Sequence, residues 1–436
     1  MNSYKKKLLN LIPSILLTSS LCSTFSPSAA PSRDTISESD TPSSIIRHNI
    51  SKTVAETDPK KNSHEKDVST FNTYEQSCSC INQCNLDVSF GIADIKYDNE
   101  SLKILEFGEG TRSMFSGYDS LYGVGAMWRN IWDFLSQQNR ILHFVDKDLT
   151  TPAARRTVAY TRLSTHRGIG CSALHTLLNH PRFTPNTPSL TIIRHDPAHA
   201  PHLHELAQIF PETLICNAAI APFVNNKKES DKLFSGTLRQ FRPWALTINK
   251  QAVHNAVPAI LQACPAAAFV IKPLASCKGN GVLFASRENL ATTLQTILQP
   301  AQRGPKTLSP NEAFWRHDKN TELIIESCET SKTVLVDGAP YDATLRVVYG
   351  LTHRPQRIQS CILGMYWKLP TTPLNQKGSL QDKKLSHIGA ASGKCAAPVS
   401  PEDAEAITAI VQPLLAQIYD QMISSSTLHT LEKGCV

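Results

Sequence analysis

Apolar and polar positions follow two different patterns along the chain, and the change falls near residue 249. Before it, apolar and β-branched runs alternate with stretches of helical spacing. The runs cover residues 102–108, 143–145, 189–194 and 213–217, and the helical stretches include residues 128–136 and 200–209. Apolar runs of this kind are typical of parallel strands that are buried on both faces. We therefore expect an α/β domain with an open, mostly parallel sheet over residues 101–248.

From residue 249 onward, the expected strands are shorter and follow one another closely. Apolar side chains at helical spacing predict a helix at residues 249–264. Strands are then predicted at residues 267–274, 281–285, 322–326, 333–336, 344–351 and 358–368, with helices at 287–298 and 401–419. Ser400 is the expected N-cap of the last helix. The pattern predicts an α+β domain over residues 249–436, with an antiparallel sheet that supports a ligand.

The first hundred residues have another character. Lys5, Lys6 and Lys7 precede an apolar run at 8–21, small residues follow at 26–30, and no acidic residue occurs before Asp34. This layout predicts a signal peptide or membrane leader over residues 1–30. An uncleaved anchor is the alternative, although the run is short for a membrane span. The Ser- and Thr-rich residues 31–100 are expected to form a disordered linker.

The leader bears on location. We expect an exported or membrane-associated protein whose leader contacts a membrane only transiently. A cytoplasmic location is the alternative if the leader does not function.

Charge and cysteine content narrow the range of partners. The net charge is +7, but Lys and Arg are spread along the 436 residues, and no basic stripe with interleaved aromatics occurs. We therefore expect no nucleic-acid partner. The twelve cysteines permit export with some disulfides. Cys78, Cys80 and Cys84 could bind a metal, but no fourth ligand stands at zinc-like spacing, so local disulfides or free thiols are favoured.

The first candidate for chemistry is a lysine inside an apolar strand. Lys272 lies within residues 269–274, and a loop containing Lys278, Gly279 and Gly281 follows at once. A buried ammonium is costly unless it reaches an anion, and glycines allow backbone N–H groups to turn toward a phosphate. The pair therefore fits either a phosphate cradle or an ordinary hairpin with a snorkelling lysine.

A second block favours the phosphate cradle. The predicted strand 322–326 ends at Glu326, and Asp342 and Arg346 lie at even spacing farther along. Arg346 stands among apolar residues, where an unpaired guanidinium would be expensive. Arg346 is then either the partner of Asp342 in a structural ion pair or a phosphate-clamping arginine that Asp342 orients.

Taken in order, these motifs resemble the ATP-grasp superfamily. The order is residues 269–274, the glycine loop, 325–326, 342–346 and 364–368. In that family two α+β subdomains close on ATP, and a preceding α/β domain supplies part of the substrate site. The resemblance covers about 160 residues closely and roughly 100 more loosely. It implies that residues 249–436 form the two subdomains and that residues 101–248 form the preceding domain.

The resemblance also implies roles for individual residues. Arg346 and Lys368 are the expected catalytic residues, because Arg346 matches the arginine that meets the transferring phosphoryl group and Lys368 matches a basic position on the next strand. The expected nucleotide-binding residues are Lys272 for the phosphates, Lys278, Gly279 and Gly281 in the covering loop, Ile325 and Glu326 at the hinge beside the adenine, and Asp342.

The cofactors implied are ATP and Mg²⁺, and the substrates are a carboxylate and an amine, as small molecules or peptides. Members of the family usually end the domain with an acidic strand that has an Asn two places on, and no such pair follows Tyr419 here. Asp342, Asp382 and Glu326 are the nearest oxygen ligands, and the metal site stays unassigned. Two hypotheses remain: an ATP-dependent carboxylate–amine ligase, or a catalytically inactive exported relative that binds a nucleotide or a partner.

Overall fold

A computed structural model describes the chain in thirteen segments, all within the unit Val68–Val436. They are residues 87–99, 101–109, 112–137, 141–146, 170–173, 189–193, 214–217, 219–224, 226–276, 279–298, 308–354, 357–386 and 395–433. The predicted leader, the cysteine cluster at 78–84, the predicted helix at 200–209 and Lys278 lie outside these segments. None of the helices in the described segments has the length and apolar character needed to cross a bilayer.

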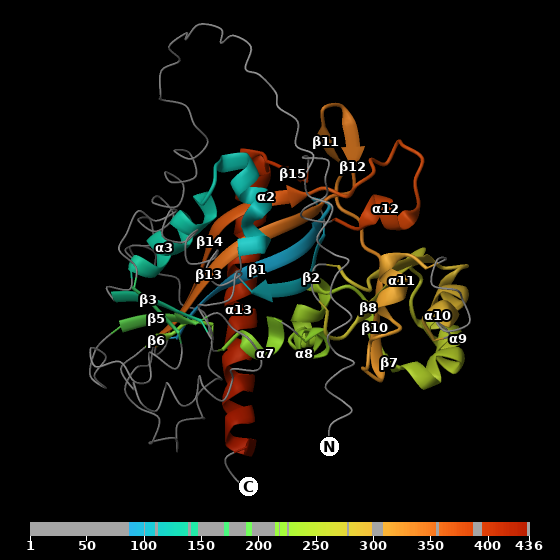
Figure 1. The fold of residues 1–436 in the computed structure, drawn as a ribbon, viewed down its shortest axis with the longest axis horizontal. Coiled ribbons are helices and arrows are strands. Elements are labelled where there is room, and N and C mark those ends of the chain that lie inside the picture. Colours follow the sequence, from blue (N-terminus) through green and yellow to red (C-terminus); the bar gives the residue numbers. More distant parts are fainter. Residues whose placement is uncertain are drawn as a thin grey trace, which may run out of the picture. The chain divides into compact units, whose positions relative to one another are not determined.

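The largest sheet is antiparallel and joins the first two described strands to three strands from beyond residue 343 (Figure 1). Its order is β15 (Ala396–Ala397), β14 (Arg357–Lys368), β13 (Thr344–Arg354), β1 (Asp87–Tyr97) and β2 (Leu102–Glu109). The strand β1 pairs with β13 from Asp87 opposite His353 to Ile95 opposite Leu345. We call this the large sheet.

Helices cover both faces of the large sheet. On one face, Ala93, Leu345 and Val347 pack in a core with α13 (Pro401–Lys433). On the other, α2 (Arg112–Tyr122) and α3 (Ala126–Ser136) cover Ile92 and Val348. Because successive side chains of a strand point to opposite faces, each strand contributes to both cores. The side chains at positions 94 and 346 therefore share the face that carries α2 and α3.

A second antiparallel sheet has four strands, in the order β7 (Ala245–Asn249), β10 (Glu322–Ser327), β8 (Ala268–Pro273) and β9 (Leu283–Ser286). We call it the small sheet. Helices α9 (Val253–Ala263) and α10 (Leu290–Leu298) pack on it through a core that includes Ile260, Leu294 and Ile325. The buried central strand β10 is apolar apart from its ends, which explains why its position could be predicted.

The remaining elements are a parallel sheet, a hairpin and several short helices. The strands β4 (Gly170–Ala173), β3 (Ile141–Asp146), β5 (Ser189–Ile193) and β6 (Leu214–Ile215) pair in parallel, and β11 (Val334–Val336) forms a hairpin with β12 (Ala339–Tyr341). The short helices are α7 (Ala221–Val224), α8 (Lys227–Lys232), η2 (Gly236–Phe241), η3 (Lys250–Ala252), α11 (Pro310–Phe314) and α12 (Leu380–Lys384).

Two predictions about the first half are wrong. The linker does not extend to residue 100, because Asp87–Tyr97 is a buried strand. The run at 102–108 is not in a parallel sheet with the other predicted strands. It is β2, and it pairs antiparallel with β1 at the edge of the large sheet. Apolar runs indicate burial on two faces but carry no information about the direction of the neighbouring strand.

Several predictions about the second half are confirmed. Strands occupy five of the six predicted positions closely, and the glycine-containing stretch 281–285 contributes β9 only from Leu283. The Ser400 Oγ accepts a hydrogen bond from the Asp403 N–H at 3.2 Å, so Ser400 is the N-cap of α13. The boundary predicted at 249 falls within the small sheet, since Asn249 is the last residue of β7.

Candidate active site

The large sheet and the small sheet both contribute side chains to one cavity of about 400 Å³. Six of its lining residues are basic and four are acidic. The basic residues are Lys96, Lys227, Lys272, Arg346, Lys368 and Lys384, and the acidic residues are Asp94, Glu106, Glu326 and Glu329. Charges are rarely gathered in a concave, partly apolar site without a ligand or a structural pairing, so their partners decide what the cavity can do.

Asp94 is the centre of the charge cluster on the large sheet. Its carboxylate accepts hydrogen bonds from Arg346 Nε at 2.7 Å, from Arg346 Nη2 at 2.8 Å and from Lys368 Nζ at 2.8 Å. Asp94 lies directly opposite Arg346 in the pairing of β1 with β13, so the arginine binds it with two parallel bonds. The three side chains are between 3% and 10% exposed.

The pKa values of this cluster follow from its burial and its charges. Burial raises the pKa of Asp94, but the charges of Arg346 and Lys368 outweigh that effect and hold it well below its usual range. Burial lowers the pKa of Lys368, and the neighbouring Arg346 lowers it further, while Asp94 opposes both. The carboxylate is therefore ionised at neutral pH, and Arg346 keeps its charge.

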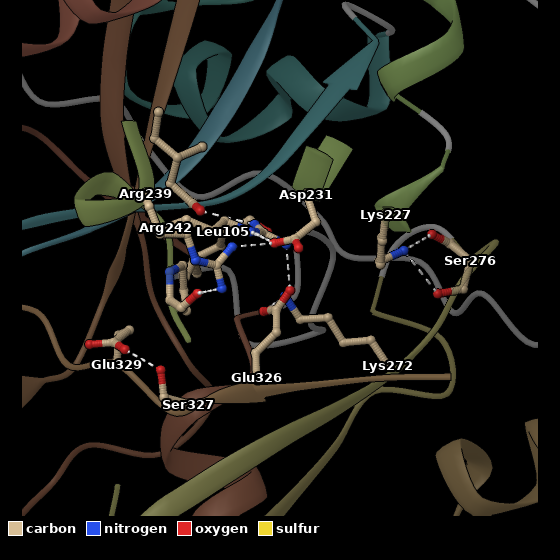
Figure 2. A network of polar contacts seen from close by, with 12 residues as sticks. Leu105, Lys227, Asp231, Arg239, Arg242, Lys272, Ser276, Glu326, Ser327 and Glu329 are labelled. Carbon is tan, nitrogen blue, oxygen red and sulfur yellow. Dashed lines mark hydrogen bonds and ion pairs between the residues drawn. The ribbon is translucent and has the colours of Figure 1, made fainter. Parts of the chain in front are cut away.

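A second cluster lies on the small sheet and is drawn in Figure 2. Glu326 accepts a hydrogen bond from Lys272 Nζ at 2.5 Å and another from Arg242 Nη2 at 2.6 Å. Burial raises the pKa of Glu326, but the charges of Arg242 and Lys272 prevail and lower it. Lys272 thus reaches the cavity from β8 with its ammonium already partnered by a carboxylate.

Asp342 does not play the role predicted for it. It is absent from the cavity lining and binds Lys96 at 2.8 Å, together with Lys384, rather than Arg346. Residues four apart in an extended strand are separated by about 13 Å, which is too far for an ion pair. The cross-strand neighbour Asp94 is much closer to Arg346 and takes the place that the sequence assigned to Asp342.

The predicted loop and hinge residues are only partly gathered at the cavity. Gly279 lines it. Gly281 does not, and its amide donates to Asn311 Oδ1 at 3.1 Å. The Ile325 side chain is buried in the core of the small sheet and does not line the cavity, so only its backbone could contact a base, and that role stays a prediction. Glu326 does line the cavity, together with the residues that follow it, Ser327, Cys328 and Glu329.

Sequence reasoning missed the acidic residues of the β1–β2 hairpin. Glu106 is the register partner of Asp94 across this hairpin, and both line the cavity. The signal was present, because Glu106 stands between the apolar residues Leu105 and Phe107. The signal is weak, because the pairing of Asp94 with Glu106 and with Arg346 depends on which strands are neighbours and not on local spacing.

The carboxylates determine whether a metal fits. Within the described segments there is no group of three or more His, Cys, Asp or Glu residues that could hold a metal by itself. Magnesium, however, is usually bound through one or two carboxylates, with phosphate and water oxygens completing its coordination. Glu106 makes no ion pair in the described segments and lies opposite Asp94 on the neighbouring strand. Asp94 is itself bound to Arg346 and Lys368, so the two carboxylates fit that kind of site only where a phosphate takes over those cations. Of the three candidates named from the sequence, Glu326 and Asp342 are bound to cations, and Asp382 caps α12.

Comparisons with known proteins give matches only among solved structures. No protein-family model matches the chain, and no curated protein does. A candidate gamma-glutamylcysteine synthetase from Methylobacillus flagellatus KT is 10% identical, with a TM-score of 0.37, over 78% of this chain and 89% of that one. A D-cycloserine synthetase is 13% identical (TM-score 0.33; 66% and 82% covered), and D-alanyl-alanine synthetase A from Vibrio cholerae is 9% identical (TM-score 0.30; 65% and 81% covered).

The function is inferred below from the residues that line the cavity.

Proposed function

We propose that this chain is an ATP-dependent ligase of the ATP-grasp type, which joins a carboxylate to an amine. One observation carries the proposal. Lys272, Arg346 and Lys368 come from three strands of two separate sheets and converge on a single cavity. Phosphoryl transfer requires positive charge around the phosphate oxygens more than it requires a covalent residue, and these three cations would supply it.

The hairpin β1–β2 supplies the complementary carboxylates. Asp94 and Glu106 are the residues that would hold Mg²⁺, whose role when bound is to neutralise phosphate charge and orient the phosphates. In the described part of the chain the Glu106 carboxylate makes no ion pair, which leaves it available for a cation. Asp94 would exchange part of its contact with Arg346 and Lys368, so that those two cations turn to the phosphates.

The proposed reaction has two steps. A substrate carboxylate oxygen attacks the γ-phosphorus of ATP, the bond from that phosphorus to the bridging oxygen breaks, and ADP leaves. The amine then attacks the acyl carbon, the bond from that carbon to the phosphate oxygen breaks, and phosphate and a proton are released. Arg346 and Lys368 would stabilise the charge on the transferring group, and Lys272 would hold the phosphates that stay on ADP.

Binding and turnover can be tested separately. We expect calorimetry to detect magnesium-dependent ATP binding, and Lys272→Ala to weaken it roughly 10- to 100-fold, the effect of losing a charge-assisted hydrogen bond. Lys250→Ala is the matched control, because Lys250 pairs with Asp318 at 3.1 Å and does not line the cavity. A panel of amino acids and dipeptides, offered as acids and amines, should then stimulate ADP release.

Each negative result has a distinct meaning. If the wild-type protein binds no nucleotide, the ATP-grasp proposal is wrong. If ATP binds tightly but no acid and amine pair releases ADP, the ligase activity is wrong and the inactive, nucleotide-binding alternative is supported.

A further inference from the structure

Arg242 links the small sheet to the acidic hairpin of the large sheet. It follows η2, and its side chain is 1% exposed. Its Nη1 donates to the carbonyl oxygens of Ile104 at 3.0 Å and Leu105 at 2.5 Å, both on β2. Its Nη2 donates to Glu326 at 2.6 Å, on β10. Figure 2 shows the guanidinium between these groups.

Two further contacts hold the guanidinium in place. Its Nε donates to Asp231 Oδ1 at 3.1 Å, and its central carbon lies 5.6 Å from the centroid of the Phe234 ring. A guanidinium has five N–H donors in one plane, and at least four are used here. A lysine ammonium has a single nitrogen and cannot satisfy acceptors on both strands together with Asp231.

The acceptors of Arg242 stand next to the groups that would bind nucleotide and metal. Leu105 immediately precedes Glu106, so the Leu105 carbonyl fixes the strand at the point where that carboxylate enters the cavity. Glu326 holds Lys272 at 2.5 Å through its other oxygen. Arg242 also offsets part of the charge on Glu326, which would otherwise act on the Lys272 ammonium alone.

We propose that Arg242 is a positioning residue that fixes Lys272 and Glu106 relative to each other and leaves the charge of Lys272 available to a phosphate. The inference rests on the proposed nucleotide site and assigns Arg242 no contact with the nucleotide. Without Arg242, Glu326 would bind Lys272 more strongly, and β2 would lose the donor that orients Glu106. Both changes would weaken binding of the magnesium–ATP complex.

The chain offers a matched control in Arg239. It also binds Asp231, at 3.1 Å, but its side chain is 39% exposed and it contacts neither Glu326 nor β2. Arg239→Lys therefore removes an arginine beside Asp231 and leaves the Arg242 link between the two sheets intact. Arg242→Lys keeps the charge and removes the planar donor array.

The experiment measures ATP affinity by calorimetry, with magnesium and with EDTA, on variants whose folding is checked by circular dichroism and a thermal melt. For Arg242→Lys we expect the Kd for magnesium–ATP to rise about tenfold, as for loss of a hydrogen bond to a charged group. We also expect a higher magnesium concentration at half-maximal binding. Arg239→Lys should bind as the wild type does. A double-mutant cycle with Glu106→Gln should give a combined loss smaller than the product of the separate losses.

A folded Arg242→Lys protein that binds magnesium–ATP with wild-type affinity overturns the proposal, and so does a cycle with independent losses. If Arg242→Lys does not fold, Asp231→Asn removes only the outer support of the guanidinium. It should then raise the same Kd severalfold, and an unchanged Kd would count against the proposal. Absence of nucleotide binding by the wild type would instead refute the proposed function, so the two failures are distinguishable.

Discussion

At the scale of single residues, the site is organised by carboxylates that each hold two cations. Asp94 binds Arg346 and Lys368, and Glu326 binds Arg242 and Lys272. A buried cation without a counter-charge is expensive, so these pairs keep four cations in place before any ligand arrives. The same pairs make each carboxylate essential for the fold, independently of any role toward a ligand.

Glu326→Gln tests that requirement. The substitution leaves Lys272 buried without a carboxylate and Arg242 with Asp231 as its remaining carboxylate partner, and we expect it to lower the free energy of unfolding by about 3–5 kcal/mol. Urea denaturation at neutral pH measures the change. Glu229→Gln is the control, because Glu229 pairs with Lys232, whose side chain is 61% exposed, and such a pair contributes at most about 1 kcal/mol. Equal losses in the two variants would contradict the argument.

At the scale of elements, the β1–β2 hairpin determines the composition of the site. It precedes every other described strand in sequence, yet β1 lies against β13, where Asp94 is opposite Arg346. Where β1 begins, Asp87 accepts a hydrogen bond from Tyr419 of α13. In the family that the motifs resemble, the acidic strand follows the last helix. Here the acidic strands β1 and β2 precede α13 in sequence but share a core with it. An antiparallel sheet allows this arrangement, because the hydrogen bonds between its strands do not depend on their order along the chain.

The turn after β8 gives a prediction at this scale. Gly281 has φ +73°, and an added Cβ would lie 2.5 Å from the Phe314 ring and 2.7 Å from Pro273. Gly281→Ala should therefore cost about 1–2 kcal/mol of backbone strain and about 1–3 kcal/mol of overpacking.

Gly338→Ala separates the two effects. Gly338 has φ +77° but nothing within 4 Å of an added Cβ, so only the strain applies. Thermal unfolding of both variants should show the larger loss for Gly281→Ala, and the opposite order would refute the packing argument.

At the scale of the whole molecule, the buried carboxylates predict acid sensitivity. The pKa values of Asp94, Glu326 and Asp342 are all lowered in the folded protein. A carboxylate with a depressed folded pKa stabilises the fold above its unfolded pKa, near 4, and loses that contribution as the pH falls toward the folded pKa. We expect the free energy of unfolding to decrease steadily below about pH 5.

Denaturant unfolding at pH 7, 5 and 3 measures this decrease. Asp94→Asn should be less stable than the wild type at pH 7 and should lose less between pH 5 and pH 3, because one of the three titrating groups is absent. A variant with the same slope as the wild type would show that Asp94 does not contribute to the acid sensitivity.

Sequence alone determined the elements of the second half and the location of the cations. Strands such as β8, β10 and β13 are set by local runs of apolar residues, and Lys272, Arg346 and Lys368 stand out because charges are rare in such runs. The helix α13 and its cap at Ser400 were readable for the same reason, since both depend on neighbouring residues.

Only the tertiary structure decided which residues meet. The ion pair of Arg346 joins residues 252 positions apart, and that of Arg242 with Glu326 joins residues 84 apart. No periodicity or local spacing specifies such contacts, because they depend on which strand lies beside β13 and on the packing of the two sheets. The sequence thus determined that cationic side chains stand within apolar strands. The pairing of β1 with β13 decided which carboxylates face them, because strand neighbours lie about 5 Å apart whatever their distance along the chain.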